Sequence, residues 1–167
     1  MQLKLTHTFD APLQTVYDAR FERFNHLDKI PGLRKPNYLD FKEDEKTVTT
    51  VRTFEAAENA VPAPIKKMLS EDMFKFVETS ALDKKAFRID WKVEPKAQKD
   101  KLIWKGVTTF TEKNGVVERV IDATIKVKVP FIGDQMEKSI ASGFKKSMEK
   151  DHRTICAMIE LMKKGDV

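Results

Sequence analysis

Three polar side chains occupy positions where the surrounding pattern predicts an apolar face. His7 interrupts the apolar face of an N-terminal alternation, and Arg119 interrupts that of a later one. Asp151 lies in the centre of an apolar helix stripe, between Ser147 and Thr154. An unpaired charge in an apolar interior is costly in free energy. We therefore expect each of these side chains to have a partner, a wet cavity or a ligand.

Two interpretations remain open for these residues. In a structural role, His7 is a hydrogen-bonded core histidine, the head of Arg119 reaches water near the start of its strand, and Asp151 forms an ion pair or hydrogen bond to the sheet. In a functional role they line a pocket, where Asp151 or His7 would be the acid or base of an enzyme. Arg52 is ambiguous, because Val48 to Phe54 alternates poorly.

No catalytic or metal-binding signature accompanies these residues. His152 follows Asp151 directly, but successive residues of a helix project about 100° apart, so the two form no dyad. The three histidines show no metal-ligand spacing. A glycine-rich phosphate loop, a nucleophile elbow and a pair of catalytic carboxylates are all absent from the sequence. We therefore expect no metal and no cofactor.

The composition is that of a globular protein with a charged surface. Apolar residues make up 41% and charged residues 34% of the 167 positions, a length that suits one ordinary domain. The net charge of +5 is a weak excess, and lysine alternates with glutamate along most segments. A nucleic-acid binder concentrates its basic residues in one patch, so nucleic-acid binding is not expected.

Cysteine content and hydropathy indicate the cellular compartment of the protein. Cys156 is the only cysteine, which excludes an intramolecular disulfide and suits a reducing environment. The N-terminal stretch "MQLKLTHTFDAP" lacks the apolar segment of a signal peptide, and no apolar run approaches the roughly 18 residues that span a bilayer. The sequence predicts a cytoplasmic protein without stable membrane insertion.

The elements that must position these side chains are a strand, two short helices, a meander and a long helix. The first strand covers Leu3 to Phe9, and Asp10 is expected to cap the helix that follows. The stretch "HLDKIPGLRKP" predicts a second short helical turn. Polar turns such as "EDEK" and "KNG" make the later strands antiparallel neighbours. Those strands are expected near 37–43, 46–57, 72–82, 86–95, 101–112 and 116–129.

The last helix is predicted from Asp134 to Lys164, about 46 Å at about 1.5 Å per residue. Its apolar stripe predicts packing against the concave face of the sheet. A coiled coil is disfavoured because its best seam is polar at the centre, and a membrane-surface helix because the polar face mixes both charge signs. The stripe consists of Met136, Ile140, Phe144, Met148, Ile155, Met158 and Met162.

One interruption of the meander, Ala60 to Ser70, contains two prolines before a short amphipathic turn. We expect it to form a covering element near one entrance of a cavity. Its "VPAPIKKML" and the later "VKVPFIGDQMEKSIASGFKKSMEKDHRTICAMIE" look like segments of an uncharacterised bacterial family. In its order of elements the sequence resembles the START-like and polyketide-cyclase-like (SRPBCC) superfamily, to which that family belongs.

The resemblance implies an α+β helix-grip fold, a single domain over 1–167. A curved antiparallel seven-stranded sheet would wrap around the long C-terminal helix. The implied function is binding or carrying a hydrophobic small molecule, a lipid or polyketide-like compound, between sheet and helix. A cyclase, dehydratase or hydrolase of the same fold, and a protein- or membrane-interaction module, are the alternatives. The expected cavity residues are His7, Trp91, Trp104, Phe110, Arg119, Ile121, Phe144, Ser147, Asp151, Thr154 and Ile155.

Overall fold

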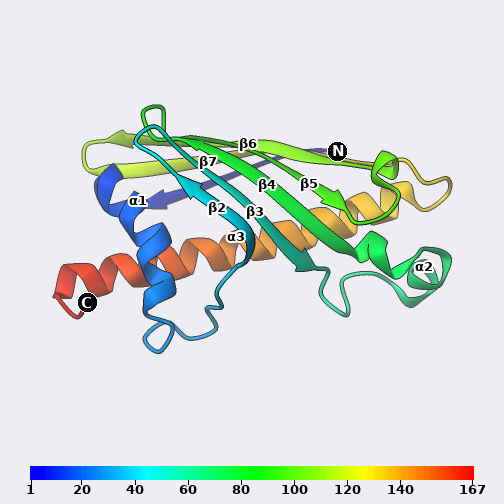
Figure 1. The fold of residues 1–167 in the computed structure, drawn as a ribbon, viewed down its shortest axis with the longest axis horizontal. Coiled ribbons are helices and arrows are strands. Elements are labelled where there is room, and N and C mark those ends of the chain that lie inside the picture. The colour runs from blue at the N-terminus through cyan, green and yellow to red at the C-terminus, as the bar shows by residue number, and fades with distance from the viewer.

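A seven-stranded antiparallel sheet arches over one long helix in the computed structural model, which describes residues 1–167 (Figure 1). The strands are β1 (Gln2–Phe9), β2 (Asn37–Glu43), β3 (Thr47–Glu55), β4 (Lys75–Asp83), β5 (Arg88–Pro95), β6 (Leu102–Lys113) and β7 (Val116–Val127). The α-helices are α1 (Leu13–Glu22), α2 (Ala63–Met68) and α3 (Gly133–Lys164). Short 3₁₀ turns are η1 (Arg23–Asn25), η2 (Glu71–Phe74) and η3 (Lys99–Lys101).

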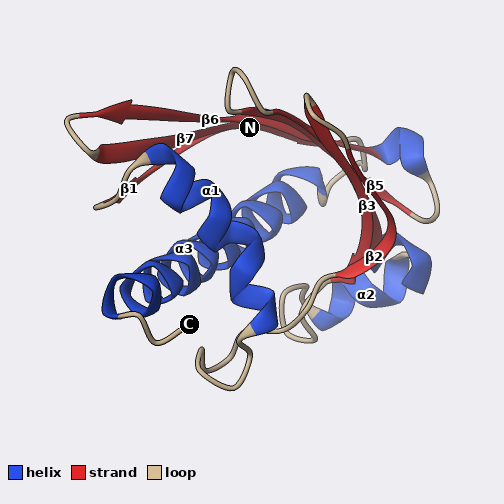
Figure 2. Ribbon diagram, turned by 60° about the vertical axis from the view of Figure 1, so that its left-hand side comes forward, coloured by secondary structure: helices blue, strands red, loops and turns tan.

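The sheet has the order β1-β7-β6-β5-β4-β3-β2. The strands from β2 to β7 follow one another as a meander, and β1 closes onto β7 at the far edge. Figure 2 shows α3 running along the concave side of the sheet with α1 beside it. This is the predicted α+β helix-grip arrangement, in which a curved antiparallel seven-stranded sheet grips the C-terminal helix.

Strict alternation gives β7 one buried face and one largely exposed face. Its inward side chains are buried from Val117 to Val127, whereas the intervening Glu118, Asp122 and Lys126 are exposed. Its pairing with β1 sets His7 directly opposite Arg119. The two polar interruptions singled out in the sequence are therefore neighbours on the concave face.

The long helix α3 is amphipathic, as predicted. Ile155 and Met158 of its apolar stripe are fully buried, and the residues on its charged face, such as Glu149 and Arg153, are exposed. Its start packs tightly, because a Cβ at Gly133 would lie 2.6 Å from the carbonyl oxygen of Val127. Gly165 ends the helix in the left-handed conformation, with φ 71°.

The start of α1 corrects the capping prediction. The helix begins at Leu13 after Pro12, whose extended backbone has ψ 155°, and no side chain caps it. Asp10 lies too far before the helix to cap it and is exposed, and its carbonyl oxygen accepts a hydrogen bond from Lys163 Nζ at 2.8 Å. The second short helical turn predicted in His26–Pro36 is not formed: this stretch contains only turns and a bend, with Gly32 at φ 77°, and the 3₁₀ turn η1 lies directly before it.

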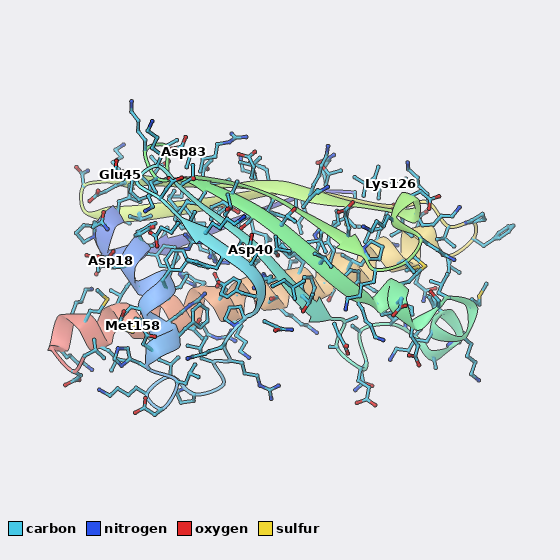
Figure 3. All side chains as sticks on the ribbon, viewed as in Figure 1. Asp18, Asp40, Glu45, Asp83, Lys126 and Met158 are labelled. Atoms are coloured by element: carbon cyan, nitrogen blue, oxygen red, sulfur yellow. The ribbon has the colours of Figure 1, made fainter.

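The side chains between the sheet and α3 form two hydrophobic clusters. At the α1 end, Val16 and Ala19 of α1 pack with Ile155 and Met158 of α3. At the α2 end, Ile65 joins a second cluster that contains Phe76, Trp104, Ile125, Val127, Met136 and Ala141. In Figure 3, Met158 lies on α3, while Glu45 and Asp83 lie together at the hairpin tips above α1. No helix is long and apolar enough to cross a membrane.

Candidate ligand-binding site

The sheet and α3 separate toward the α2 end and enclose a cavity of about 680 Å³, called here the apolar cavity. Of its 23 lining residues, 15 are hydrophobic. They come from β3, β4, β6, β7, the segment before α2, η2, α3 from Met136 to Lys150 and, through Arg34, the loop before β2. Small-molecule sites have volumes of about 300 to 1,000 Å³, so the space is large enough for a ligand.

Aromatic rings form one wall of the apolar cavity. Trp104 contacts Phe54, Phe76 and Phe144 edge to face, at ring-centroid distances of 6.0, 5.6 and 5.8 Å. Such aromatic pairs contribute about 0.5 to 1.5 kcal/mol each beyond the area they bury. The indole Nε1 of Trp104 is buried and has no hydrogen-bond partner. This part of the wall is apolar and held by ring packing.

A smaller space of about 150 Å³, called here the arginine chamber, lies between α1, η1, the middle of the sheet and α3. It adjoins the apolar cavity, because the same four residues line both: Arg52, Glu78, Phe144 and Met148. The charged residues around the chamber are Arg20, Arg23, Arg52, Glu78, Arg119 and Asp151.

Asp151 ties three elements together in the wall of the chamber. Arg23 of η1 donates from Nη2 to Asp151 Oδ1 at 2.6 Å, and Arg119 of β7 donates to Oδ2. Arg23 also donates to the hydroxyl of Thr154 at 2.6 Å. Arg119 donates a further bond to the carbonyl oxygen of Met148 at 3.2 Å. We call Asp151, Arg23 and Arg119 the Asp151 clamp, since they join η1, β7 and α3.

The clamp keeps Asp151 ionised. Burial alone would raise the pKa of this carboxyl, but Arg23 and Arg119 outweigh burial and hold it well below its usual range. The side chain of Arg119 is only 3% exposed, so the guanidinium does not reach water as its structural interpretation supposed. A carboxylate held in this way is a poor proton donor near neutral pH.

His7 adjoins the clamp from β1. Its Nδ1 lies 3.2 Å from Arg119 Nη2, and because a guanidinium only donates, Nδ1 must be the acceptor and the ring neutral. Burial lowers the pKa of His7 to about 4, and the positive charge of Arg119 adds to the effect. The ring also packs against that of His152, with the centroids 4.9 Å apart.

Arg52 and Glu78 form a second ion pair, in the wall that the two spaces share. The guanidinium donates two parallel hydrogen bonds, from Nε and Nη2, to the two carboxylate oxygens at 2.9 Å each. The residues face one another across β3 and β4. This bidentate geometry fixes both side chains and satisfies their charges.

The predicted site residues separate into three groups. Ser147 and Trp104 line the apolar cavity, and Phe144 lines both spaces. His7, Thr154 and Ile155 line neither space, because they pack at the closed α1 end: His7 and Thr154 bind clamp residues and Ile155 is fully buried. The remaining residues line the arginine chamber, together with Phe144: Trp91, Phe110, Arg119, Ile121 and Asp151.

Sequence reasoning missed Arg20 and Arg23 as chamber residues. A signal for Arg23 is present, since Val16, Ala19 and Arg23 follow the i, i+3, i+7 spacing of one helix face and all three are buried. The pairing of Glu78 with Arg52 was also missed, although both face inward. No group of three or more His, Cys, Asp or Glu side chains is arranged to hold a metal.

The segment from Ala60 to Ser70 lies beside the apolar cavity. Ala60 and Val61 belong to the lining, and Ile65 of α2 is buried in the adjoining hydrophobic cluster. Met68 at the end of α2 is 66% exposed. The segment is thus anchored through Ile65 and contributes to one wall of the cavity, next to solvent.

Several solved structures resemble this chain over nearly its full length. The protein TTHA0849 from Thermus thermophilus has a TM-score of 0.63 at 11% identity, covering 97% of this chain and 99% of that one. The Zhui aromatase/cyclase from Streptomyces sp. R1128 has a TM-score of 0.60 at 13% identity, covering 96% and 94%. A START superfamily protein from Mycobacterium smegmatis has a TM-score of 0.52 at 11% identity, covering 96% and 98%.

These similarities establish the START-like fold, which the Zhui aromatase/cyclase shares. No curated protein matches the sequence. A family described as "Protein of unknown function (DUF2505)" matches residues 4–159, almost the whole chain. The chain therefore belongs to the DUF2505 family and has a START-like helix-grip fold.

Proposed function

We propose that this protein binds a hydrophobic small molecule, a lipid or polyketide-like compound, in the apolar cavity and carries or senses it. The observation that supports the proposal most directly is the size and lining of the apolar cavity. Its volume is about 680 Å³, and 15 of its 23 lining residues are hydrophobic. We also propose that residues 1–167 act as one binding domain, because β1 pairs with β7 and α3 spans the sheet.

The enzyme alternative gains no support from the two acid–base candidates. Asp151 is ionised and bonded to two guanidinium groups, and a base with so low a pKa abstracts protons poorly. His7 lines neither space and its Nδ1 is taken by Arg119. The interaction-module alternative rests on scattered exposed side chains such as Phe131 and Met68.

A fluorescence titration with the neutral apolar probe N-phenyl-1-naphthylamine tests the proposal. Ser139 is a half-buried cavity residue on α3, whereas Ser142 is exposed and lies outside the lining. Ser139→Trp should weaken probe binding about tenfold or more, and the matched Ser142→Trp should leave it within about twofold. Equal affinities in both variants would contradict binding in the apolar cavity.

Native mass spectrometry of gently purified protein provides a second readout. A bound molecule should add a discrete mass to the protein, and Ser139→Trp should reduce that species relative to Ser142→Trp. If probe binding is absent from the unaltered protein and no added mass is seen, the proposal is wrong.

A further inference from the structure

The arginine chamber carries positive charge that its own carboxylates do not balance. Four guanidinium groups line it, those of Arg20, Arg23, Arg52 and Arg119, against the carboxylates of Glu78 and Asp151. Glu78 is paired with Arg52, and Asp151 is shared by Arg23 and Arg119. Both acids are therefore occupied, and Arg20 is left without an acidic partner.

The guanidinium of Arg20 makes no hydrogen bond or ion pair within the protein. Its Cζ lies 5.1 Å from the ring centroid of Phe110 and 5.3 Å from that of Phe21, so two aromatic rings hold it in place. Burial lowers the pKa of Arg20 to about 10; Asp151 opposes this, and the like charges of Arg23 and Arg119 add to it. The group is still charged near neutral pH, in surroundings that favour an added anion.

Guanidinium is the side chain best suited to a planar or tetrahedral anion, because its donors match two oxygens at once. The chamber of about 150 Å³ suits a small head such as a carboxylate rather than a bulky substituted one. Thr50 and Ser80, whose hydroxyls lie 2.7 Å apart, add polar groups to the same lining. The chamber thus combines a free cation, polar neighbours and limited space.

The chamber and the apolar cavity adjoin through one layer of side chains. Of the four shared lining residues, Met148 is the most adaptable, because methionine has several rotatable bonds and no branch. A single molecule with a polar end and an apolar body would satisfy both spaces. Its body would bury apolar surface, and its end would neutralise Arg20.

We propose that the ligand is an amphipathic anion, a long-chain monocarboxylate whose apolar body lies in the apolar cavity and whose carboxylate is bound by Arg20 in the arginine chamber. This inference rests on the proposed function and narrows it to one ligand class. Arg52–Glu78 and the Asp151 clamp then serve as fixed walls, since their charges are already paired.

Competition against bound N-phenyl-1-naphthylamine tests the inference with ligands that share one chain and differ in the head. Dodecanoate should displace the probe at about tenfold lower concentration than dodecanol, and dodecyltrimethylammonium should be weakest. Dodecyl phosphate, with the same chain, compares a phosphate head with the carboxylate. A preference for dodecyl phosphate over dodecanoate would overturn the assignment of a carboxylate.

Arg20→Gln should abolish the preference for acid over alcohol while leaving dodecanol affinity within about twofold, and Arg20→Lys should retain part of it. Arg153→Gln, which removes an exposed arginine from the outer face of α3, should change neither affinity. If Arg20→Gln does not fold, the preference in the unaltered protein still tests the ligand class, and its partial loss in Arg20→Lys tests the assignment to Arg20.

The two proposals fail in different ways. Equal displacement by dodecanoate and dodecanol would overturn the carboxylate site and leave apolar binding intact. Absence of probe binding and of binding by every alkyl compound would overturn the proposed function itself. An acid preference that persists in folded Arg20→Gln would assign the head to a group other than Arg20.

Discussion

The two ends of the interface between the sheet and α3 are built in different ways. At the α1 end, α1 and η1 occupy the space between sheet and helix except for the small arginine chamber, and Ile155 and Met158 of α3 have no exposed surface. The Asp151 clamp adds ion pairs there between η1, β7 and α3. Helix, sheet and α1 form a closed core, in which each polar group of the clamp except Arg119 Nε has a partner.

At the α2 end, no long helix lies between the sheet and α3. The N-terminal half of α3 presents Ile140 and Phe144, both half-buried, to the apolar cavity. The short helix α2 anchors only Ile65 in the core. One helix thus serves as a core element along its C-terminal half and as a cavity wall along its N-terminal half.

This difference indicates how the fold separates stability from binding. Closed packing and ion pairs at the α1 end hold the sheet and α3 together, so the α2 end does not have to be filled. Cavities destabilise a protein unless the rest of the structure compensates for them. Substitutions at the two ends should therefore have different consequences for stability.

Asp151→Ala should cause a large loss of stability, because it leaves Arg23 and Arg119 buried without their counter-ion. Removing one partner of a buried ion pair costs about 3 to 5 kcal/mol. The side chain of Asp151 is 24% exposed, so we expect the lower end of that range. Urea denaturation near neutral pH measures the change in the free energy of unfolding.

Glu149→Ala is the matched control for this substitution. Glu149 is an exposed acid two residues away on α3, and its loss should change the free energy of unfolding by less than about 0.5 kcal/mol. Asp151→Asn, which keeps an acceptor oxygen but loses the charge, should lie between the two. Similar values for Asp151→Ala and Glu149→Ala would show that the clamp does not hold the α1 end together.

Two isoleucines on the same face of α3 compare the ends directly. Ile155→Ala removes a fully buried side chain and should cost about 2 to 5 kcal/mol. Ile140→Ala only widens a space that already exists, so we expect a loss of about 1 kcal/mol. Thermal or chemical denaturation of both variants checks the difference. Equal losses would mean that the α2 end is packed as tightly as the α1 end.

Lowering the pH should reduce the free energy of unfolding through His7, which lies at the α1 end. The pKa of His7 is about 4 in the folded protein and about 6.5 in the unfolded chain, so the unfolded state binds the proton first as pH falls. This contribution to stability is fully present above about pH 6.5 and is lost between about pH 6.5 and 4. Burial, Arg119 and His152 lower the pKa, whereas Asp151 and Glu149 oppose them.

His7→Asn removes the titration and offers Arg119 an amide oxygen in place of Nδ1. The free energy of unfolding should then vary less between about pH 6.5 and 4 than in the unaltered protein. Asp151, whose folded pKa is depressed, should lower stability only as the pH falls below about 3.8. An unchanged pH profile in His7→Asn would show that this histidine does not couple protonation to the α1 end.

Much of the fold could be predicted because its signals are local. The alternation from Val117 to Val127 and the apolar stripe of α3 depend on residues a few positions apart. The partners of polar groups are not local: Arg23 and Asp151 are 128 positions apart, and no pattern near either residue identifies the other. The sequence pattern identified His7, Arg119 and Asp151 as unusual, but not Arg23, and not which of these residues pair.

The extent of the cavity could not be predicted from the sequence either, because it also depends on contacts between distant residues. An inward position on a helix shows the same apolar spacing whether its side chain faces a packed core, as that of Ile155 does, or an open space, as that of Ile140 does. The absence of a second long helix at the α2 end determines which of the two occurs. Arg20 was missed because its guanidinium packs between the rings of Phe21 and Phe110, and Phe110 is far away in the sequence.

A substitution at Gly143 has the smallest expected effect and tests whether the α2 end is open. Gly143 lies within α3 at the open end, where it is exposed and borders the apolar cavity. A Cβ built there meets no atom within 4 Å. Glycine in a helix interior is less favourable than alanine by about 0.5 to 1 kcal/mol, because the unfolded chain gains more freedom with glycine.

Gly143→Ala should therefore raise the free energy of unfolding by about 0.5 to 1 kcal/mol, as measured by urea denaturation. One added methyl group in open space should also leave the affinity for N-phenyl-1-naphthylamine within about twofold. A gain in stability with unchanged probe binding would mean that α3 at this end supports the cavity as an ordinary helix with room beside it. A loss of stability would show instead that neighbouring groups close onto Gly143 in solution, and the α2 end would then be more tightly packed than a cavity of 680 Å³ allows.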